Sequence, residues 1–359
     1  MGQPADWVPG LGGSTDLAAA DRSYGALMTT DNVTTHPHET VWSITNAGVP
    51  ASCLHLVAEL GVADRLDGPA EVADLAERCS AEPAALDRVL RLLVSHGVFT
   101  RQGTVYAHND ASALLRSDHP ASMRAFARMM GLPVIGRTFA ALHRSVADGS
   151  PAIESVSPGG LWAHLRSHPD EAAIFNSAMQ AKAQADIGAV VSAYDFQPFT
   201  TVADVAGGLG HLLRAILDAA TDARGILFEV PGVVDSLPDP GPRLSYHRGD
   251  FFADRLPRAD CYVLMEVIHD WPDEAAIAIL RGIRGAASPG ATVLIVEGIR
   301  DPAVDDPREA TLDVIMLAVT GGRERTPAEL GDLLKAAGFR STALIETAGA
   351  MKVLEAVAV

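Results

Sequence analysis

The chain has 359 residues, 48% of them hydrophobic and 20% charged, and this balance predicts a soluble protein of two folding units. The net charge of −17 argues against nucleic acid or an anionic membrane as a partner. The sequence contains no uninterrupted apolar run of about 18 residues, the length needed to span a membrane. Three cysteines without metal or redox spacing, and a start unlike a signal peptide, predict reduced thiols and a cytoplasmic location.

Residues 1–37 are rich in Gly, Pro, Ser, Thr and Asp without periodicity, so we expect a flexible N-terminal arm. From Val41 on, apolar residues recur at helical spacing until Gly61, which can end a helix. Two short helices, EVADLAERCS and EPAALDRVLRLLVSHGV, then precede FTRQGTVYAH, which fits a small hairpin. Residues 38–118 are therefore predicted to form a mainly helical, winged-helix-like domain.

A winged-helix outline is typical of DNA binding, but it also occurs in packing and dimerisation domains. The helix that would read DNA, Pro83 to His96, carries Arg88 and Arg91. Glu82 and Asp87 offset these two cations in a chain that is strongly acidic overall. A DNA-reading helix should be basic, so we favour dimerisation.

Residues 119–195 are predicted to be a helical linker that also lines the substrate pocket. Packing in the core explains most of its apolar side chains. Methionine and aromatic side chains also suit flat apolar ligands. The side chains in question are Phe126, Met129, Met130, Phe139, Trp162, Phe175 and Met179.

From residue 196 to the end, short apolar runs alternate with helical segments, which predicts an α/β domain with a mostly parallel sheet covered on both faces. The predicted strands are Thr201–Ala206, Gly225–Glu229, Leu244–His247, Cys261–Val267 and Thr292–Glu297, with helices at His211–Ala220 and Asp273–Ala287. The last segment predicts one more helix and a hairpin of two strands that turns around Ala348–Gly349.

The segment DVAGGLGHLLRAIL places a glycine-rich turn between a strand and a helix. Asp204 with Gly207, Gly208 and Gly210 would let a ligand approach the backbone beside a helix N-terminus. A dinucleotide fingerprint would need a third glycine where Leu213 stands, so the spacing suits S-adenosylmethionine better. A plain tight turn remains the alternative.

Two further acidic residues follow the next two strands. Glu229 ends the second strand, where its carboxylate could accept from both ribose hydroxyls. Asp250 follows the third strand and could accept from the adenine amino group, while Phe251 stacks on the ring. Each residue alone could be a cap or a surface charge, but features at three successive strand ends together favour a cofactor site.

The fourth strand, CYVLMEV, runs into IHDWPDE. Asp270 could cap the next helix, but His269 stands at the carboxyl end of the strand, before that helix begins. In a doubly wound sheet of order 3-2-1-4-5, strands 1 and 4 flank the crevice where ligands bind. We therefore expect His269 to face the glycine loop and to act in catalysis rather than only in packing.

Methyl transfer to oxygen requires the nucleophile to lose a proton. A phenol has a pKa of about 10 and an ordinary imidazole one of about 6.5, so a neutral histidine can accept the phenolic proton. Glu297 ends the fifth strand, within expected reach of the imidazole, where a carboxylate would hold the tautomer and stabilise the imidazolium.

Taken in order, DVAGGLG, FEVPGVV, GDFF, VIHDWPDE, VEG and GGRERT resemble the S-adenosylmethionine-dependent small-molecule O-methyltransferases, both plant caffeic-acid-type and bacterial natural-product enzymes. The resemblance covers the chain from about residue 40 to its end. It implies a class I, Rossmann-like methyltransferase domain, a winged-helix dimerisation domain and a homodimer. It also implies that His269 is the general base, flanked by Glu297 and by Glu324 of GGRERT.

The resemblance also indicates which residues face the ligands. FNSAM implies Phe175, Asn176 and Met179 as substrate contacts, and LDVIML implies Met316. We place Met130 and Trp162 with the substrate residues, and Met265 and Trp271 with the cofactor residues. No metal is expected, since no HExxH or comparable spacing occurs.

Three positions depart from the family pattern. Ala206 replaces the usual first glycine of the loop, which a methyl group tolerates if φ is negative there. Met265 stands where many relatives have a basic residue, so we expect that cofactor contact to be lost. Glu266 is unusual beside the site, and we interpret it as a paired or hydrated carboxylate on the opposite face.

The predicted function is O-methylation, by S-adenosylmethionine, of a hydroxyl of a small aromatic natural product, most simply a phenol. One alternative keeps the cofactor but catalyses a non-methylating step, such as hydroxylation, decarboxylation, dehydration or a pericyclic reaction. Others are a nicotinamide-dependent oxidoreductase and a winged-helix regulator that senses S-adenosylmethionine. The acceptor itself, and whether it is oxygen, nitrogen or carbon, stay open.

Overall fold

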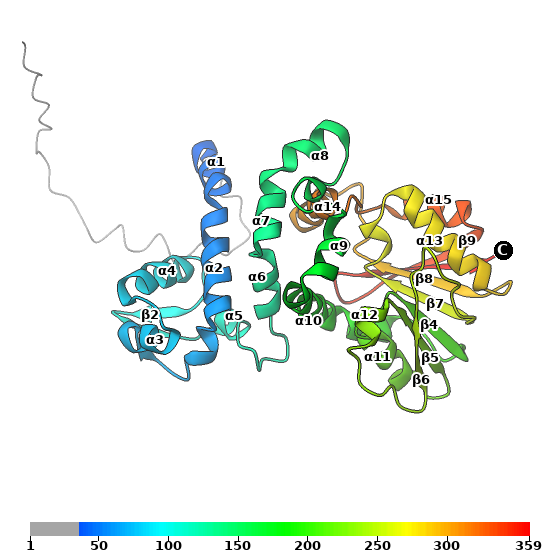
Figure 1. The fold of residues 1–359 in the computed structure, drawn as a ribbon, viewed down its shortest axis with the longest axis horizontal. Helices are drawn as coiled ribbons and strands as arrows, with labels where there is room; N and C mark the ends of the chain where they lie inside the picture. The colour runs from blue at the N-terminus through cyan, green and yellow to red at the C-terminus, as the bar shows by residue number, and fades with distance from the viewer. Residues whose placement is uncertain (1–35) are drawn as a thin grey trace, which may run out of the picture. The chain divides into compact units, whose positions relative to one another are not determined.

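The structure is a computed structural model that describes residues 36–359 (Figure 1). The predicted flexible arm, residues 1–37, lies almost wholly outside the described residues. The chain divides into two compact units, Met1–Ala47 and Gly48–Val359. In the first unit, helix α1 (Pro37–Asn46) is described. The four segments predicted from the sequence, with boundaries near residues 37, 118 and 195, stay a prediction.

The second unit begins with helix α2, which is followed by the two short helices and the hairpin that the sequence predicts. Its elements are α2 (Gly48–Leu60), η2 (Ala63–Arg65), β1 (Ala70–Glu71), α3 (Val72–Cys79), α4 (Pro83–Ser95), β2 (Thr100–Gln102), β3 (Val105–Ala107) and α5 (Asp110–Ala113). Strands β1, β3 and β2 pair antiparallel in that order. Helix α4 starts where it does because Pro83 suits the first turn and Glu82 accepts from the Ala85 amide at 2.6 Å.

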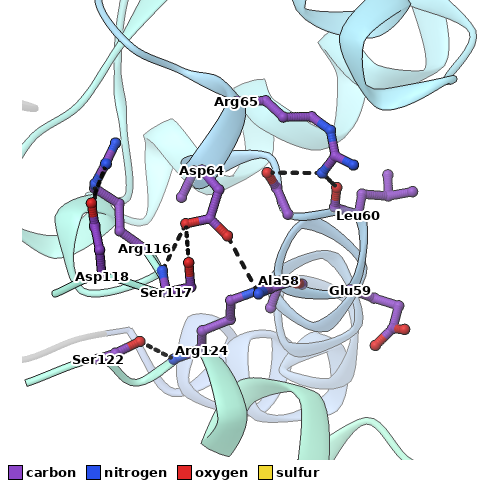
Figure 2. A network of polar contacts seen from close by, with 12 residues as sticks. Ala58, Glu59, Leu60, Asp64, Arg65, Arg116, Ser117, Asp118, Ser122 and Arg124 are labelled. Carbon is purple, nitrogen blue, oxygen red and sulfur yellow. Dashed lines mark hydrogen bonds and ion pairs between the residues drawn. The ribbon is translucent and has the colours of Figure 1, made fainter.

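A polar network joins α2 and η2 to the segment that follows α5 (Figure 2). Asp64 accepts from the amide and the hydroxyl of Ser117, at 2.7 and 3.0 Å, and forms an ion pair with Arg124 at 3.3 Å. Arg124 also donates to the Ala58 carbonyl at 2.9 Å. These contacts fix the small domain to the helical segment that starts at Arg124.

The helical segment is interrupted rather than continuous. It consists of α6 (Arg124–Met130), α7 (Pro133–Ala140), α8 (Leu142–Asp148), η3 (Ala152–Ser155), α9 (Gly160–Ser167) and α10 (Pro169–Ala193). The breaks fall at glycine and proline, for example at Gly149, whose φ is +79°, and before Pro169. Among the helices of residues 36–359, none is both long and apolar enough to cross a membrane.

The C-terminal part has the predicted α/β architecture, with seven strands in the order β6-β5-β4-β7-β8-β10-β9. The strands are β4 (Thr201–Val205), β5 (Arg224–Glu229), β6 (Leu244–Arg248), β7 (Cys261–Met265), β8 (Thr292–Glu297), β9 (Phe339–Glu346) and β10 (Lys352–Ala358). The first five are parallel in the predicted order 3-2-1-4-5, and β9 and β10 form the predicted antiparallel hairpin. The helices are α11 (His211–Ala219), α12 (Pro231–Val234), η4 (Ile268–Asp270), α13 (Asp273–Ala286), α14 (Pro307–Val319) and α15 (Pro327–Ala336).

Both faces of the central strands β4, β7 and β8 are buried, as their near-continuous apolar sequences predict. On one face, α13 and α15 pack through residues such as Ile279 and Leu334. On the other, α10 and α11 pack through Val190 and Ile216. Each of these side chains is fully buried, which contributes about 1.5–3 kcal/mol apiece. Because β4 and β7 are parallel neighbours, their carboxyl ends open on one crevice, where the candidate site lies.

Candidate active site

The loop after β4 carries a left-handed backbone at three places. Gly208 and Gly210 have φ of +55° and +75°, which glycine adopts readily because it has no Cβ. Ala206 has φ of +58°, so the expectation that its methyl group is tolerated through a negative φ is wrong. Its amide donates to the Phe228 carbonyl of β5 at 2.8 Å, which holds the strained residue in place.

Asp204, at the end of β4, is fully buried against this loop. A Cβ on Gly207 would lie 2.3 Å from its carboxylate, so only glycine allows the approach. Within the described residues, neither carboxylate oxygen of Asp204 has a hydrogen-bond partner. Burial, with a smaller contribution from Glu229, raises the pKa of Asp204 to about 7. An unpaired buried carboxylate is costly, so this side chain is suited to a cationic ligand.

Glu229 ends β5 beside the same loop. Its two carboxylate oxygens accept from the Gly208 amide at 3.0 Å and from the Val230 amide at 2.8 Å. Burial raises the pKa of Glu229, although the two amides oppose that shift. Asp204 and Glu229 thus bring two carboxylates from adjacent strands to one glycine-rich turn.

Three aromatic residues meet beyond β6 and β7. The rings of Phe251 and Phe252 contact Trp271 edge-on, with centroids 5.8 and 4.8 Å apart. Asp250 is exposed and accepts from the Phe252 amide at 2.8 Å, so its carboxylate caps its own turn. The structure therefore brings the predicted cofactor residues Phe251 and Trp271 together.

His269 lies in η4, directly after β7, and is 4% exposed. Its Nδ1 lies 2.8 Å from Glu324 Oε1. Glu297 accepts from the backbone amide of His269 at 2.9 Å. The sequence predicted that Glu297 would hold the imidazole, but its hydrogen bond is to the main chain. Within residues 36–359, Nε2 makes no hydrogen bond and lies 3.9 Å from Asp270 Oδ1. Asp270 does not cap α13 either, because the N-cap residue is Pro272.

The charges around the imidazole decide its protonation. Burial would lower the pKa of His269, but the hydrogen bond to Glu324 and the charges of Asp270 and Glu297 outweigh it and raise the pKa to about 10. Burial raises the pKa of Glu297 to about 7 and that of Asp270 to about 6. The raised pKa favours the protonated imidazole at neutral pH in the ligand-free protein, whereas the sequence predicted an ordinary, neutral histidine.

Glu324 reaches His269 because the loop after α14 presses against η4. A Cβ on Gly322 would lie 1.8 Å from the His269 carbonyl oxygen, and the Arg323 amide donates to that oxygen at 2.9 Å. The Glu324 amide in turn donates to Asp313 of α14 at 2.8 Å. Gly322 and Asp313 were not predicted, although both stand in the motifs GGRERT and LDVIML.

Arg325 is a second residue that the sequence argument missed. It is 2% exposed and donates to the carbonyls of Ile268 and Trp271, at 3.1 and 2.7 Å. It also forms an ion pair with Asp273 at 2.7 Å. Arg325 thus fixes both ends of the turn that carries His269.

Glu266 forms a buried ion pair with Lys182 of α10. The prediction of a paired carboxylate is therefore correct, and its placement on the opposite face stays a prediction. The charge of His269 contributes to lowering the pKa of Glu266, and the charge of Glu266 contributes to raising that of Asp270. Nothing in the sequence singled out Lys182.

Of the predicted substrate residues, Met130, Trp162 and Phe175 pack around one apolar cluster with α7, η3 and α14. The Trp162 ring contacts Phe175 edge-on and also stacks on Trp271, with centroids 5.9 and 6.3 Å apart. The substrate-side aromatics are thereby continuous with the cofactor-side ones. Asn176, Met179 and Met316 are not part of this cluster, and Met316 is buried against Thr320. Met265 packs under α10 and α11.

Comparison with known proteins decides the family. Residues 139–340 match the O-methyltransferase domain, and residues 42–118 match the O-methyltransferase dimerisation domain. The chain belongs to the O-methyltransferase family. It is 36% identical to a phenazine O-methyltransferase of Lysobacter antibioticus, over 84% of this chain and 91% of that one.

Solved methyltransferase structures are also similar to this chain. An O-methyltransferase from neocarzinostatin biosynthesis, in complex with S-adenosylmethionine and 2-hydroxy-5-methyl naphthoic acid, is 33% identical with a TM-score of 0.73 and covers 87% of this chain and 96% of its own. An N,N-8-amino-8-demethyl-D-riboflavin dimethyltransferase from Streptomyces davawensis is 30% identical with a TM-score of 0.74. The match covers 90% of this chain and 100% of that one.

This O-methyltransferase uses S-adenosylmethionine, as its family and its structural neighbours establish. The residues at the end of β4 and β5 fit that cofactor. The unpaired carboxylate of Asp204 suits an ammonium group, and the cradle at Gly207 leaves room that any side chain would fill. The carboxylate of Glu229 has further lone pairs for hydroxyl donors.

Proposed function

We propose that this enzyme methylates a phenolic hydroxyl of a small aromatic natural product, with His269 as general base. The observation that carries the proposal is the imidazole at the carboxyl end of β7, with Nδ1 bound to Glu324 and Nε2 left for another partner. That position is on the strand next to the one that precedes the glycine loop.

The imidazole is prepared for proton transfer by its surroundings. Glu324 orients the ring, and Glu297 fixes the backbone from which it projects. The pKa of about 10 matches that of a phenol, so the proton transfer is nearly balanced once His269 is neutral. Positive charge nearby favours that neutral form. We therefore expect His269 to accept the proton only in the complete ternary complex.

The same proposal assigns the cofactor residues. When bound, S-adenosylmethionine supplies an electrophilic methyl group on a positively charged sulfur. Asp204 and Gly207 would hold its amino-acid end, Gly208, Gly210 and Glu229 its ribose, and Phe251 and Trp271 its adenine. Asp250 and Met265 remain candidates for the adenine end. Excluding water from this crevice strengthens every electrostatic contact made there.

The substrate class is inferred from the relatives and from the apolar cluster. The relatives named above act on a phenazine and bind a naphthoic acid, both flat and aromatic. Met130, Trp162 and Phe175 offer flat or adaptable apolar surface for such a ring. Asn176, Met179 and Met316 complete the proposed substrate set from α10 and α14.

We also propose a homodimer formed through the N-terminal domain, because residues 42–118 match the dimerisation domain. In light scattering after gel filtration, the mass should be about twice the 37.6 kDa of one chain. A monomeric mass at micromolar concentration would contradict this proposal.

The central experiment compares His269→Ala with the native enzyme on a panel of hydroxylated phenazines and naphthoates. Product mass should increase by one methyl group for each S-adenosylhomocysteine released. His269→Ala should still bind S-adenosylmethionine while losing most turnover, and His143→Ala, an exposed histidine of α8, serves as the matched control. Native turnover by His269→Ala would refute the base assignment.

Two alternatives have distinct readouts. Conversion of substrate without release of S-adenosylhomocysteine would indicate a non-methylating reaction on the same fold. The riboflavin relative is named for methylation of an amino group. Two acceptors that differ only in carrying a hydroxyl or an amino group at the same position therefore show whether oxygen or nitrogen is methylated. Faster methylation of the amine would overturn the proposal.

A further inference from the structure

A buried ion pair lies beside the candidate base without belonging to the motifs that define the site. Glu266 is the first residue after β7 and stands three positions before His269. Its partner Lys182 comes from the middle of α10. The two side chains are only 13% and 16% exposed. Two opposite charges from distant parts of the chain are thus brought together three residues before the candidate base.

The position of Glu266 is fixed by its backbone. Its φ is +54°, a left-handed conformation that residues other than glycine adopt at an energetic cost. Its amide donates to the Val296 carbonyl of β8 at 2.9 Å, which secures that conformation. The turn therefore presents the carboxylate in one place.

Stability does not explain such a pair. Desolvation of two charges offsets most of their attraction, and apolar residues of similar volume usually serve folding as well or better. The segment around Glu266, CYVLMEVI, is otherwise apolar. An apolar residue at position 266 would fit this segment and would avoid the desolvation cost of the ion pair.

The pair acts electrostatically on the site. Burial alone would raise the pKa of Glu266, but Lys182 and then His269 lower it, so the carboxylate is ionised. Burial raises the pKa of Asp270, and the charge of His269 opposes that shift. Of the ion pair, Glu266 raises the pKa of Asp270 further and Lys182 lowers it. Because interaction between two charges is mutual, ionised Glu266 also favours the imidazolium form of His269.

Seven charged groups act on His269 or on the carboxylates near it in the chain or in space. They are Glu324 and Arg325 after α14, Glu297 at the end of β8, Asp270 in η4, Glu266 after β7, Lys182 on α10 and Arg308 on α14. Four of these seven are carboxylates, and Lys182 forms an ion pair with one of them, Glu266. Without Lys182 the site would gain one uncompensated negative charge.

We propose that Lys182 and Glu266 are positioning residues that set the charge of the active site, in which Lys182 cancels the Glu266 carboxylate and so determines how readily His269 gives up its proton. The inference rests on the proposed role of His269 as base. Neither residue needs to touch the substrate for this effect.

The two single substitutions should act in opposite directions. Lys182→Met leaves Glu266 uncompensated, which favours the imidazolium and should raise the pKa of His269 by about one unit. Glu266→Gln leaves Lys182 uncompensated and should lower that pKa by about one unit. The double variant Lys182→Met with Glu266→Gln should return to the native value. A purely structural role would not give opposite signs that cancel.

The experiment measures His269 directly and the reaction separately. The imidazole is titrated by NMR in protein labelled with carbon-13 histidine and saturated with S-adenosylhomocysteine, and its resonance is assigned by its loss in His269→Gln. The acidic limb of the kcat/KM profile should move with it, so that activity below the limb changes about tenfold per unit. Lys352→Met, which breaks the ion pair of Lys352 with Glu346 on the β9–β10 hairpin, is the matched control.

Opposite shifts that cancel in the double variant support the proposal. Unmoved titrations, or shifts of the same sign in both single variants, overturn it. If Lys182→Met does not fold, Lys182→Arg against Glu266→Gln answers the same question, since arginine retains the charge and should titrate as the native protein. If His269 titrates as expected while His269→Ala keeps full activity, the base assignment fails and the electrostatic inference stands.

Discussion

Replacing Glu324 by glutamine tests the hydrogen bond that orients the candidate base. The substitution preserves shape but removes the carboxylate that lies 2.8 Å from Nδ1, where the Glu324 side chain is only 1% exposed. An amide can donate or accept, so the ring loses both the charge and the preference for one tautomer. The other contacts of the loop, from Gly322 and Arg323 to the His269 carbonyl, stay in place.

The magnitude follows from the kind of bond. A hydrogen bond to a charged group is worth about 1.5–3 kcal/mol, which corresponds to roughly 10- to 150-fold in rate if it acts in the transition state. We expect kcat to fall by that factor with little change in KM, because Glu324 does not contact the substrate in this proposal. Loss of the carboxylate also removes the largest influence that raises the pKa of His269, so the acidic limb of the pH profile should move to lower pH.

Steady-state release of S-adenosylhomocysteine between pH 6 and pH 10 measures both effects. Glu346→Gln is the control, since Glu346 is a surface carboxylate that pairs with Lys352 at 3.2 Å. A Glu324→Gln enzyme with native kcat and an unchanged limb would refute the orientation argument. A limb that moves to higher pH would show that the sign of the electrostatics is wrong.

Three further substitutions test the packing of the site. Gly322→Ala should reduce kcat at least 100-fold by forcing the loop away from His269, whereas Gly285→Ala, a helical glycine with open space around it, should leave kcat unchanged. Asp204→Asn removes a buried carboxylate whose raised pKa makes folding less favourable as pH rises through about 7. At pH 8 the ligand-free variant should therefore gain a few degrees in Tm, while calorimetry should show about tenfold weaker binding of S-adenosylmethionine. Ala206→Gly should stabilise the protein by about 1 kcal/mol in urea unfolding, because it relieves a left-handed alanine, and a loss of stability would contradict the strain.

Local patterns determined the secondary structure, whereas the order of the strands came from the general topology of doubly wound sheets. Alternation of apolar runs with helical segments gave the five parallel strands and the final hairpin, because burial on both faces leaves a direct mark on each segment. The rule for ligand sites in parallel sheets then placed His269 opposite the glycine loop without any coordinates. Glu324 was available only through the family resemblance, because nothing local connects GGRERT with VIHDWPDE.

Tertiary structure alone decided which groups contact each other. Glu324, and not Glu297, holds the imidazole because Gly322 lets its loop approach the His269 carbonyl closely. No spacing in the sequence encodes this approach. The raised pKa of His269 depends on carboxylates gathered from three segments. The Lys182–Glu266 pair likewise joins helix α10 to the end of β7. Electrostatic energies depend on distance and burial in space, so the sequence could name a candidate base but not its charge.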